Sequence, residues 1–214
     1  MTDNTEYVGD ITMKILFLGD SVTEAGRIRE NPFDLGRGYA KFASELIKNS
    51  RPDCEFEFYN RGIGGNRSGD LLARLDTDGI ALCPDVVSVL VGINDSLSAV
   101  KGDGGSDEEF FNNYESILSR LKKETSAKII MMEQFVLPFD DTLCYHPDID
   151  SKIQLTRKLA REFADVYVPL DGIVASACVK YDIHELSSDG IHPREALHRI
   201  IAEHYFEAFK SLQL

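Results

Sequence analysis

The chain has 214 residues, 43% of them hydrophobic and 28% charged, and carries a formal net charge of -13 at pH 7. That length suits one large domain with a substantial core, and the composition is typical of a soluble globular protein. The negative charge argues against binding of nucleic acid or of an anionic membrane surface by bulk electrostatics, because both require clustered positive charge.

The amino-terminal segment is polar and acidic, whereas a secretory signal has a basic start followed by an apolar stretch. No part of the sequence approaches the roughly 20 apolar residues that span a bilayer. We therefore predict a short polar extension over residues 1–12, a single domain over residues 13–214, a cytoplasmic location and no membrane partner.

Five β-rich runs alternate with stretches of helical period. The runs cover residues 13–19, 55–60, 85–92, 128–134 and 165–170. Between them, apolar residues recur at helical spacing, and a glycine-rich loop over residues 102–106 precedes a helix expected from Asp107. This alternation predicts a three-layer α/β/α sandwich around a five-stranded parallel sheet, for which we expect the flavodoxin-like order 2-1-3-4-5.

In doubly wound sheets, ligands bind outside the carboxyl ends of the strands where the strand order reverses. With the expected order, the ends of the first three strands lie side by side. They carry Gly-Asp-Ser at residues 19–21, Asn-Arg-Gly-Ile-Gly-Gly-Asn at residues 60–66 and Gly-Ile-Asn-Asp at residues 92–95. The sequence therefore predicts a site assembled from three distant segments.

Ser21 is the candidate nucleophile of this site. It follows the first strand in a turn that leads into a helix, so its own N–H can help to hold a developing oxyanion. A serine hydroxyl is a poor nucleophile at neutral pH and needs a base and a group that orients the base. The alternative is an ordinary strand-ending turn, because Gly19, Asp20 and Ser21 are all residue types that favour turns.

Gly65 and Asn94 are candidate donors to the same oxyanion. Gly65 offers a backbone N–H that substrate can approach closely, and Asn94 offers a side-chain amide. Each has a structural alternative. The glycines at 62, 64 and 65 permit tight turning with positive φ, and Asn94 can cap a helix starting near Asp95.

His192 is the candidate base, and Asp189 is the group that would orient it. One turn of chain can bring a carboxylate beside an imidazole three residues later, which fixes the tautomer and stabilises the imidazolium. Alternatively, the two residues cap the last helix, which Pro193 would open.

Two other histidines compete for the role of base. His146 and His184 have the nearby acids Asp148 and Asp182, but neither adjoins a strand end or a helix start as cleanly. The remaining two, His198 and His204, follow the apolar pattern of the last helix and are predicted to be surface or packing residues.

Two further residue types bear on function. The four cysteines are widely spaced without a C-x-x-C pair, which predicts buried, reduced thiols: Cys54, Cys83, Cys144 and Cys178. Several arginines lie near the predicted site in sequence, where they can steer an anionic substrate or pair with Glu24, Glu30, Asp34 and Asp70. These arginines are Arg27, Arg29, Arg37, Arg61 and Arg67.

Taken in order, the four blocks at residues 19–22, 60–65, 92–95 and 189–193 resemble those of the SGNH hydrolases, also called the GDSL esterase family. The resemblance extends from residue 13 to the end of the chain. The resemblance implies that Ser21 is the nucleophile, His192 the base and Asp189 its orienter. It also implies that the Ser21 N–H, the Gly65 N–H and the Asn94 side chain hold the oxyanion. A three-layer α/β fold without metal or organic cofactor is implied as well.

Within that family, the chain is most similar to the intracellular acetylxylan esterase branch, on the Gly26-Arg27, Gly38-Tyr39, residue 60–63 and residue 91–95 blocks. Members of that branch often carry tryptophans after the asparagine block and before the carboxylate, whereas this chain has no Trp. Its absence weakens the case for xylan, because an aromatic ring is a natural platform for a sugar. The aromatic residues that can replace it are Phe33, Tyr39, Phe135, Phe139 and Tyr145.

We predict a serine carboxylic-ester hydrolase that removes acetyl or another short acyl group from a carbohydrate or small polar substrate. One alternative is a lysophospholipase or acyl-thioesterase on the same scaffold, which needs a long apolar groove. Another is a phosphate or flavin-binding module with Ser21 and Thr23 around an anion. That module leaves Asn94, Asp189 and His192 without roles. A homo-oligomer is compatible with the sequence.

Overall fold

The computed structural model describes residues 12–214. Residues 1–11 of the predicted extension lie outside this range, and Thr12 is the first residue of β1. The sheet is formed by β1 (Thr12–Gly19), β2 (Glu55–Gly62), β3 (Val86–Leu90), β4 (Lys128–Met132) and β5 (Val166–Val168). Its strands are all parallel in the order β2-β1-β3-β4-β5, as predicted.

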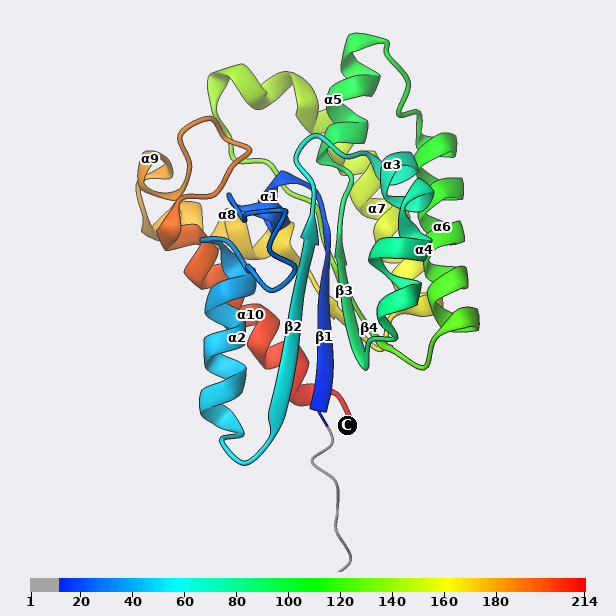
Figure 1. The fold of residues 1–214 in the computed structure, drawn as a ribbon. Coiled ribbons are helices and arrows are strands. Elements are labelled where there is room, and N and C mark those ends of the chain that lie inside the picture. Colours follow the sequence, from blue (N-terminus) through cyan, green and yellow to red (C-terminus); the bar gives the residue numbers. More distant parts are fainter. Residues whose placement is uncertain (1–11) are drawn as a thin grey trace, which may run out of the picture.

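Helices connect the strands and cover both faces of the sheet (Figure 1). The longer ones are α2 (Tyr39–Ser50), α5 (Ile93–Lys101), α6 (Asp107–Glu124), α7 (His146–Phe163), α8 (Leu170–Lys180) and α10 (Glu195–Ser211). The shorter ones are α1 (Ser21–Glu24), α3 (Ser68–Ala73), α4 (Leu75–Asp78), η1 (Ile80–Leu82), η2 (Asp140–Tyr145) and α9 (Ile183–Leu186).

Strand β1 divides the core into two halves. Ile15 and Phe17 pack with residues of α2 and α10 on one face, while Leu16 and Leu18 pack with residues of α6 on the other, and all four are fully buried. This follows from the period of two along a strand, which points successive side chains to opposite faces. The predicted three-layer α/β/α sandwich is therefore confirmed.

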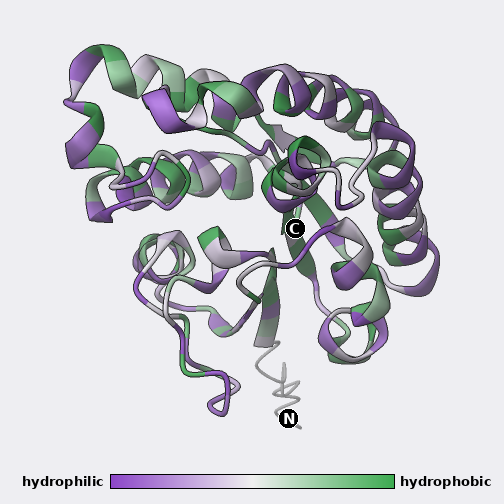
Figure 2. Cartoon of the chain, turned by 90° about the horizontal axis from the view of Figure 1, so that it is seen from above, coloured by the Kyte–Doolittle hydropathy of each residue, from purple (hydrophilic) through white to green (hydrophobic). Residues whose placement is uncertain are grey.

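Apart from α8, the longer covering helices are amphipathic, with hydrophilic and hydrophobic residues on different sides (Figure 2). Helix α6 shows why such a segment forms. It begins at Asp107, as predicted. Ser106 caps it, because its side chain accepts a hydrogen bond from the Glu109 N–H. Acidic residues fill its first turn and lysines its last, which complements the helix dipole.

The carboxyl ends of the first three strands meet at one edge of the sheet. Gly19 of β1 lies opposite Gly62 of β2 and Leu90 of β3. Gly62 is needed for this approach, because a Cβ atom there would lie 2.2 Å from the backbone nitrogen of Glu24. The end of β2 therefore packs directly against α1, which begins at Ser21.

The prediction of four buried cysteines is wrong. The thiols are free, but Cys54, Cys83 and Cys144 are exposed and Cys178 is half-buried. The three exposed residues lie in the turn before β2, just after η1 and within η2, where the chain runs over the surface.

Between Thr12 and Leu214, no helix combines the length and the apolar character required to cross a membrane.

Candidate active site

Ser21 is held at the start of α1 by its neighbour Asp20. The Asp20 side chain caps this helix, accepting a hydrogen bond of 3.0 Å from the Val22 N–H. Burial raises the pKa of Asp20 to about 7, although the Val22 N–H and nearby His192 act in the opposite direction. The capped turn presents the Ser21 hydroxyl to His192, with 3.0 Å between Oγ and Nε2.

Asp189 and His192 form the second half of the same chain of hydrogen bonds. The Asp189 Oδ2 atom lies 2.7 Å from His192 Nδ1, and Oδ1 accepts the N–H groups of Ile191 and His192 at 3.0 and 2.8 Å. Partial burial opposes ionisation, but hydrogen bonds from the ring and both backbone groups lower the pKa of Asp189 to about 2. The carboxylate is therefore charged at neutral pH.

The loop that carries these two residues is held by contacts within the loop and by one with the segment after β4. The Ser187 hydroxyl donates to the His192 carbonyl at 2.8 Å, and Ser187 and Pro193 form a β-bridge. The Gly190 carbonyl accepts a hydrogen bond of 2.8 Å from the Leu137 N–H. Because α10 begins only at Glu195 and Arg194 is its N-cap, Asp189 and His192 do not cap it. Sequence reasoning missed Ser187.

Gly65 lies in a tight turn beside Ser21. The Asn66 N–H donates to the Ile63 carbonyl at 3.2 Å, and Gly65 has a φ of 81° while Gly64 is not among the positive-φ glycines. These are the features of a type II turn, whose central peptide carries the Gly65 N–H. A Cβ atom at Gly64 would lie 3.6 Å from that of Ser21, whereas one at Gly65 would contact nothing within 4 Å.

Asn94 belongs to the segment that follows the third strand end. It lies in the first turn of α5, which begins at Ile93 rather than near Asp95, so Asn94 is not its cap. One amide hydrogen of Asn94 binds the Asn66 carbonyl at 3.0 Å. The same Nδ2 atom carries a second hydrogen. The side chain thus fixes the end of the turn over residues 63–66, the glycine turn, and keeps one amide hydrogen that it can still donate.

Two further residues lock these segments together, and sequence reasoning missed both. Asp95 is buried and accepts from the Ser68 N–H and hydroxyl at 3.0 and 2.5 Å, and burial raises its pKa despite these bonds. Arg74 binds the carbonyl oxygens of Gly19 and Arg61 at 3.0 and 2.8 Å, and the Asn66 side chain at 2.7 Å. No local pattern marks Arg74, but Asp95 directly follows Asn94.

The other histidines lie away from the Ser21 hydroxyl. His184 is on α9, where its ring packs edge-on against Phe139 at 5.0 Å. His146 begins α7, and its buried Nε2 atom lacks a partner within residues 12–214. His198 is buried on α10 and accepts the Tyr39 N–H through Nδ1 at 3.2 Å, and burial lowers its pKa to about 4.

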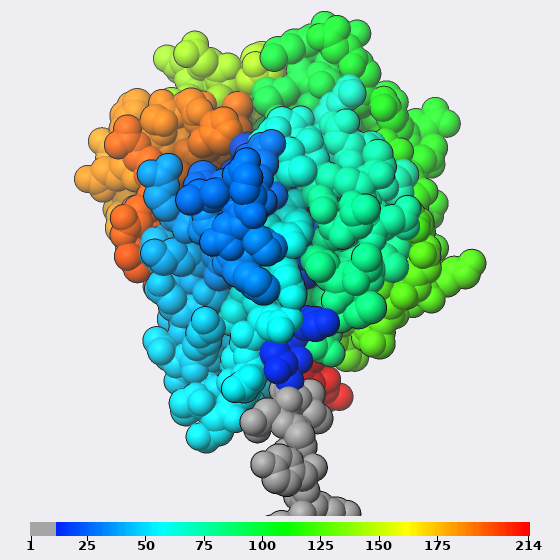
Figure 3. All heavy atoms as spheres, in the orientation of Figure 1, coloured from blue at the N-terminus to red at the C-terminus, as the bar shows by residue number. Residues whose placement is uncertain are grey.

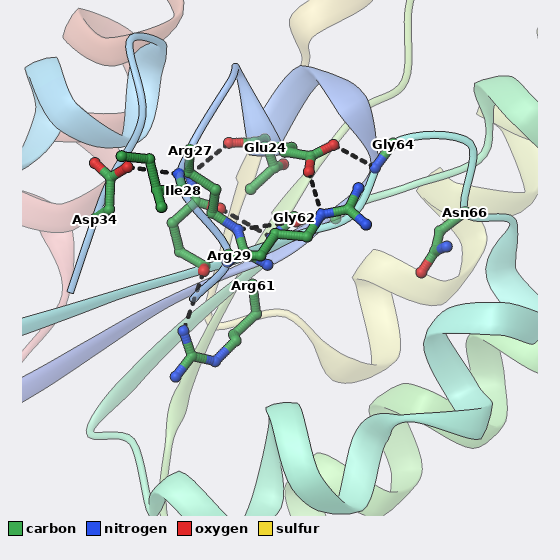
Figure 4. A network of polar contacts seen from close by, with 12 residues as sticks. Glu24, Arg27, Ile28, Arg29, Asp34, Arg61, Gly62, Gly64 and Asn66 are labelled. Carbon is green, nitrogen blue, oxygen red and sulfur yellow. Dashed lines mark hydrogen bonds and ion pairs between the residues drawn. The ribbon is translucent and has the colours of Figure 1, made fainter. Parts of the chain in front are cut away.

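The predicted arginines mostly bind the protein itself (Figure 4). Arg29 pairs with Glu24, and Arg67 lies 3.9 Å from Asp70. Arg27 is buried with its Nε atom on the Gly62 carbonyl at 3.0 Å, and Arg61 binds the Pro32 carbonyl at 3.1 Å. Asp34 accepts backbone N–H groups instead of an arginine. Arg37 lines a hollow next to Pro193.

A hollow of about 340 Å³ is lined by residues that lie close in the chain to Ser21 and His192. Ala25 follows α1 and Pro193 follows His192, and the other lining residues are Arg37, Glu195 and His198. Figure 3 shows the segments involved, the blue residues before α2 and the orange residues before α10, close together on one face. A larger hollow of about 470 Å³ lies between α8 and α10, and neither hollow has Ser21, Asp189 or His192 in its lining.

The aromatic residues considered as a sugar platform divide into two groups. Tyr39 and Phe135 are buried in the core, so they cannot serve. Phe33 is exposed and packs against Tyr59 with 5.7 Å between ring centres, while Phe139 and Tyr145 are half-buried.

The sequence and the structure both have relatives. The model of the GDSL-like lipase/acylhydrolase family matches residues 17–200. An acetylxylan esterase from Geobacillus stearothermophilus is 31% identical over 201 residues, covering 88% of this chain and 90% of that protein. The chain belongs to the GDSL-like lipase/acylhydrolase family. It is accordingly a carboxylic-ester hydrolase.

Solved structures of the family have the same fold. A GDSL-like lipase from Parabacteroides merdae superposes with a TM-score of 0.87 at 30% identity, over 92% of this chain and 95% of that one. Axe2, an acetylxylan esterase from Geobacillus stearothermophilus, gives 0.83 at 28% identity, over 92% and 93%. Solved catalytic mutants of Axe2 replace a serine or a histidine by alanine.

Across residues 12–214, His, Cys, Asp and Glu form no group of three that could hold a metal.

Proposed function

We propose that this hydrolase works through an acyl-enzyme on Ser21, with His192 as general base and Asp189 as the group that orients and stabilises it. The observation that carries the proposal is the continuous chain from Ser21 Oγ to His192 Nε2 at 3.0 Å and from His192 Nδ1 to Asp189 Oδ2 at 2.7 Å. Such a chain lets the imidazole accept the serine proton while a charged carboxylate stabilises the resulting imidazolium.

The reaction then has two halves. Ser21 Oγ attacks the ester carbonyl as its proton passes to His192 Nε2, and the oxyanion is held by the N–H groups of Ser21 and Gly65 and by Asn94 Nδ2. His192 returns the proton to the leaving alcohol, which departs and leaves the acyl group on Ser21. Water deprotonated by His192 attacks the acyl-enzyme, and the acid leaves as the proton returns to Ser21.

We propose further that the acyl group is acetyl or similarly short and that the alcohol is a carbohydrate or another small polar molecule. Two observations support this. The similar protein from Geobacillus stearothermophilus is an acetylxylan esterase. The hollow next to Pro193 carries the charged side chains of Arg37 and Glu195, which can bind hydroxyl groups.

The experiment compares esters of one alcohol with increasing acyl length, from p-nitrophenyl acetate to p-nitrophenyl decanoate, together with an acetylated methyl xyloside. We expect kcat/KM to be highest for acetate and release of acetate from the sugar. Ser21→Ala should abolish both activities, while Ser116→Ala, on the exposed side of α6, should change neither. Rates that rise with acyl length would instead support the lysophospholipase or thioesterase alternative.

A further inference from the structure

Glu24 connects the start of α1, where Ser21 lies, to the glycine turn. It lies three residues after Ser21 on α1, and its side chain is only 16% exposed. One carboxylate oxygen accepts the Gly64 N–H at 2.6 Å, and the other accepts Arg29 Nε at 2.5 Å (Figure 4). Both oxygens of this carboxylate are therefore used, one on each side.

The glycine turn needs such a contact because its own sequence does not determine its conformation. Its two central residues are Gly64 and Gly65, which adopt positive and negative φ about equally readily. Type I and type II turns differ by a flip of the central peptide, which here carries the Gly65 N–H. A flip would point that N–H away from the oxyanion, so groups outside the turn have to select its conformation.

The two ends of the turn are held by different partners. The Asn94 amide binds the Asn66 carbonyl, and Arg74 binds the Asn66 side chain, so both act at the end of the turn. At its start, the Ile63 N–H donates to the Gly19 carbonyl at 3.1 Å, and Glu24 fixes the peptide that enters Gly64. A Cβ atom at Gly64 would lie 2.8 Å from Glu24 Oε2, which shows how closely the carboxylate approaches the turn.

The charge on Glu24 strengthens this contact. Burial opposes ionisation, but hydrogen bonds from the Arg29 side chain and the Gly64 N–H outweigh it and lower the pKa of Glu24. The carboxylate is thus ionised at neutral pH. A hydrogen bond from an N–H to a carboxylate is shorter and stronger than one between neutral groups.

We propose that Glu24 is a positioning residue for ester hydrolysis, which holds the glycine turn so that the Gly65 N–H points at the oxyanion formed on Ser21. Arg29 acts through Glu24 by binding its other oxygen. The inference rests on the proposed roles of Ser21 and Gly65. A displacement of about 1 Å in such a group can lower a rate by about 100-fold.

The experiment measures kcat/KM for p-nitrophenyl acetate and the affinity for phenylboronic acid, a probe that forms a tetrahedral adduct with an active serine. Glu24→Ala should lower both by about tenfold or more, because both depend on the oxyanion donors. Glu24→Gln keeps an oxygen for the Gly64 N–H and should stay within about threefold of wild type. Glu30→Ala removes a neighbouring exposed acid and should change neither.

Arg29→Ala covers the case in which Glu24→Ala does not fold, because the Arg29 side chain is 51% exposed. It should lower kcat/KM and the boronate affinity by about threefold. In the Glu24→Gln protein, the same substitution should lower them by no more than about threefold. Wild-type values in Glu24→Ala, or in Arg29→Ala if the former is unfolded, would overturn the inference. So would reduced turnover with unchanged boronate affinity, or Gln behaving like Ala. Wild-type protein that neither turns over ester nor binds boronate would instead refute the proposed function.

Discussion

The site combines two regions that are built in different ways. On the serine side, three strand ends meet, and the supporting carboxyl groups of Asp20 and Asp95 are each 1% exposed. On the histidine side, a single loop before α10 carries Asp189 and His192, whose side chains are 47% and 53% exposed. The serine side is fixed by the sheet, whereas the histidine side is fixed mainly by contacts within its own loop.

The difference fits the roles proposed for the two sides. Donors to an oxyanion work only if they are already in place when charge develops, so they benefit from a rigid frame. A base that takes a proton from water needs access to solvent, and its orientation can be set by one carboxylate. The two regions should therefore respond differently to mutation.

Among the groups that assist Ser21, the largest effect is expected on the histidine side. His192→Ala removes the proposed base and should lower kcat for p-nitrophenyl acetate by about 10⁶-fold. His184→Ala is the matched control, because this residue also lies close to an acid, Asp182, but packs against Phe139 instead of Ser21. Loss of activity in His184→Ala with full activity in His192→Ala would place the base at His184 instead.

A smaller loss is expected on the serine side. Gly65→Ala disfavours the positive φ of the type II turn and should lower kcat by about 100-fold through loss of one oxyanion donor. Gly102→Ala is a matched control, since Gly102 also has a positive φ, of 77°, and a Cβ atom there would contact nothing within 4 Å, but it ends α5. Both variants should lose about 1–2 kcal/mol of stability. Equal activities in the two variants would contradict the role of the Gly65 N–H.

The smallest effect concerns a contact outside the two regions, between α2 and α10. His198 follows the histidine loop and accepts the Tyr39 N–H, and burial lowers its pKa to about 4. Between about pH 6.5 and 4 the unfolded chain binds a proton that the folded chain does not, so stability falls as pH falls. From pH 7 to 5, this loss is about 2 kcal/mol.

His198→Asn tests that assignment, because its amide oxygen can still accept the Tyr39 N–H but does not titrate. Urea unfolding at pH 7 and pH 5 should show a smaller loss of unfolding free energy in the variant than in wild type. An identical pH dependence in both proteins would show that His198 does not titrate in this way.

The fold and the segments of the site were predictable from local patterns. Runs such as residues 13–19 are too apolar and too short for surface helices, and their alternation with helical stretches allows few topologies. Once the strand order is 2-1-3-4-5, Ser21, Gly65 and Asn94 must lie near one edge of the sheet. The spacing of Asp189 and His192 similarly favoured their contact.

The contacts that hold these segments were not predictable in the same way. Glu24 binds a residue 40 positions away, and Arg74 binds Gly19 across 55 positions. Such contacts depend on side-chain directions that no local period specifies. Tyr39 is a related case, because an aromatic residue on an amphipathic helix can face the core or the substrate, and here it faces the core.

The most direct test of the central claim is the identity of the acylated residue. Wild-type protein is treated with a fluorophosphonate, which reacts covalently with activated serines, and its intact mass and labelled peptide are measured beside Ser21→Ala and His192→Ala. We predict one adduct on Ser21 in wild type, none in Ser21→Ala and much slower labelling in His192→Ala. Labelling at another serine, or an adduct that persists in Ser21→Ala, would contradict an acyl-enzyme on Ser21.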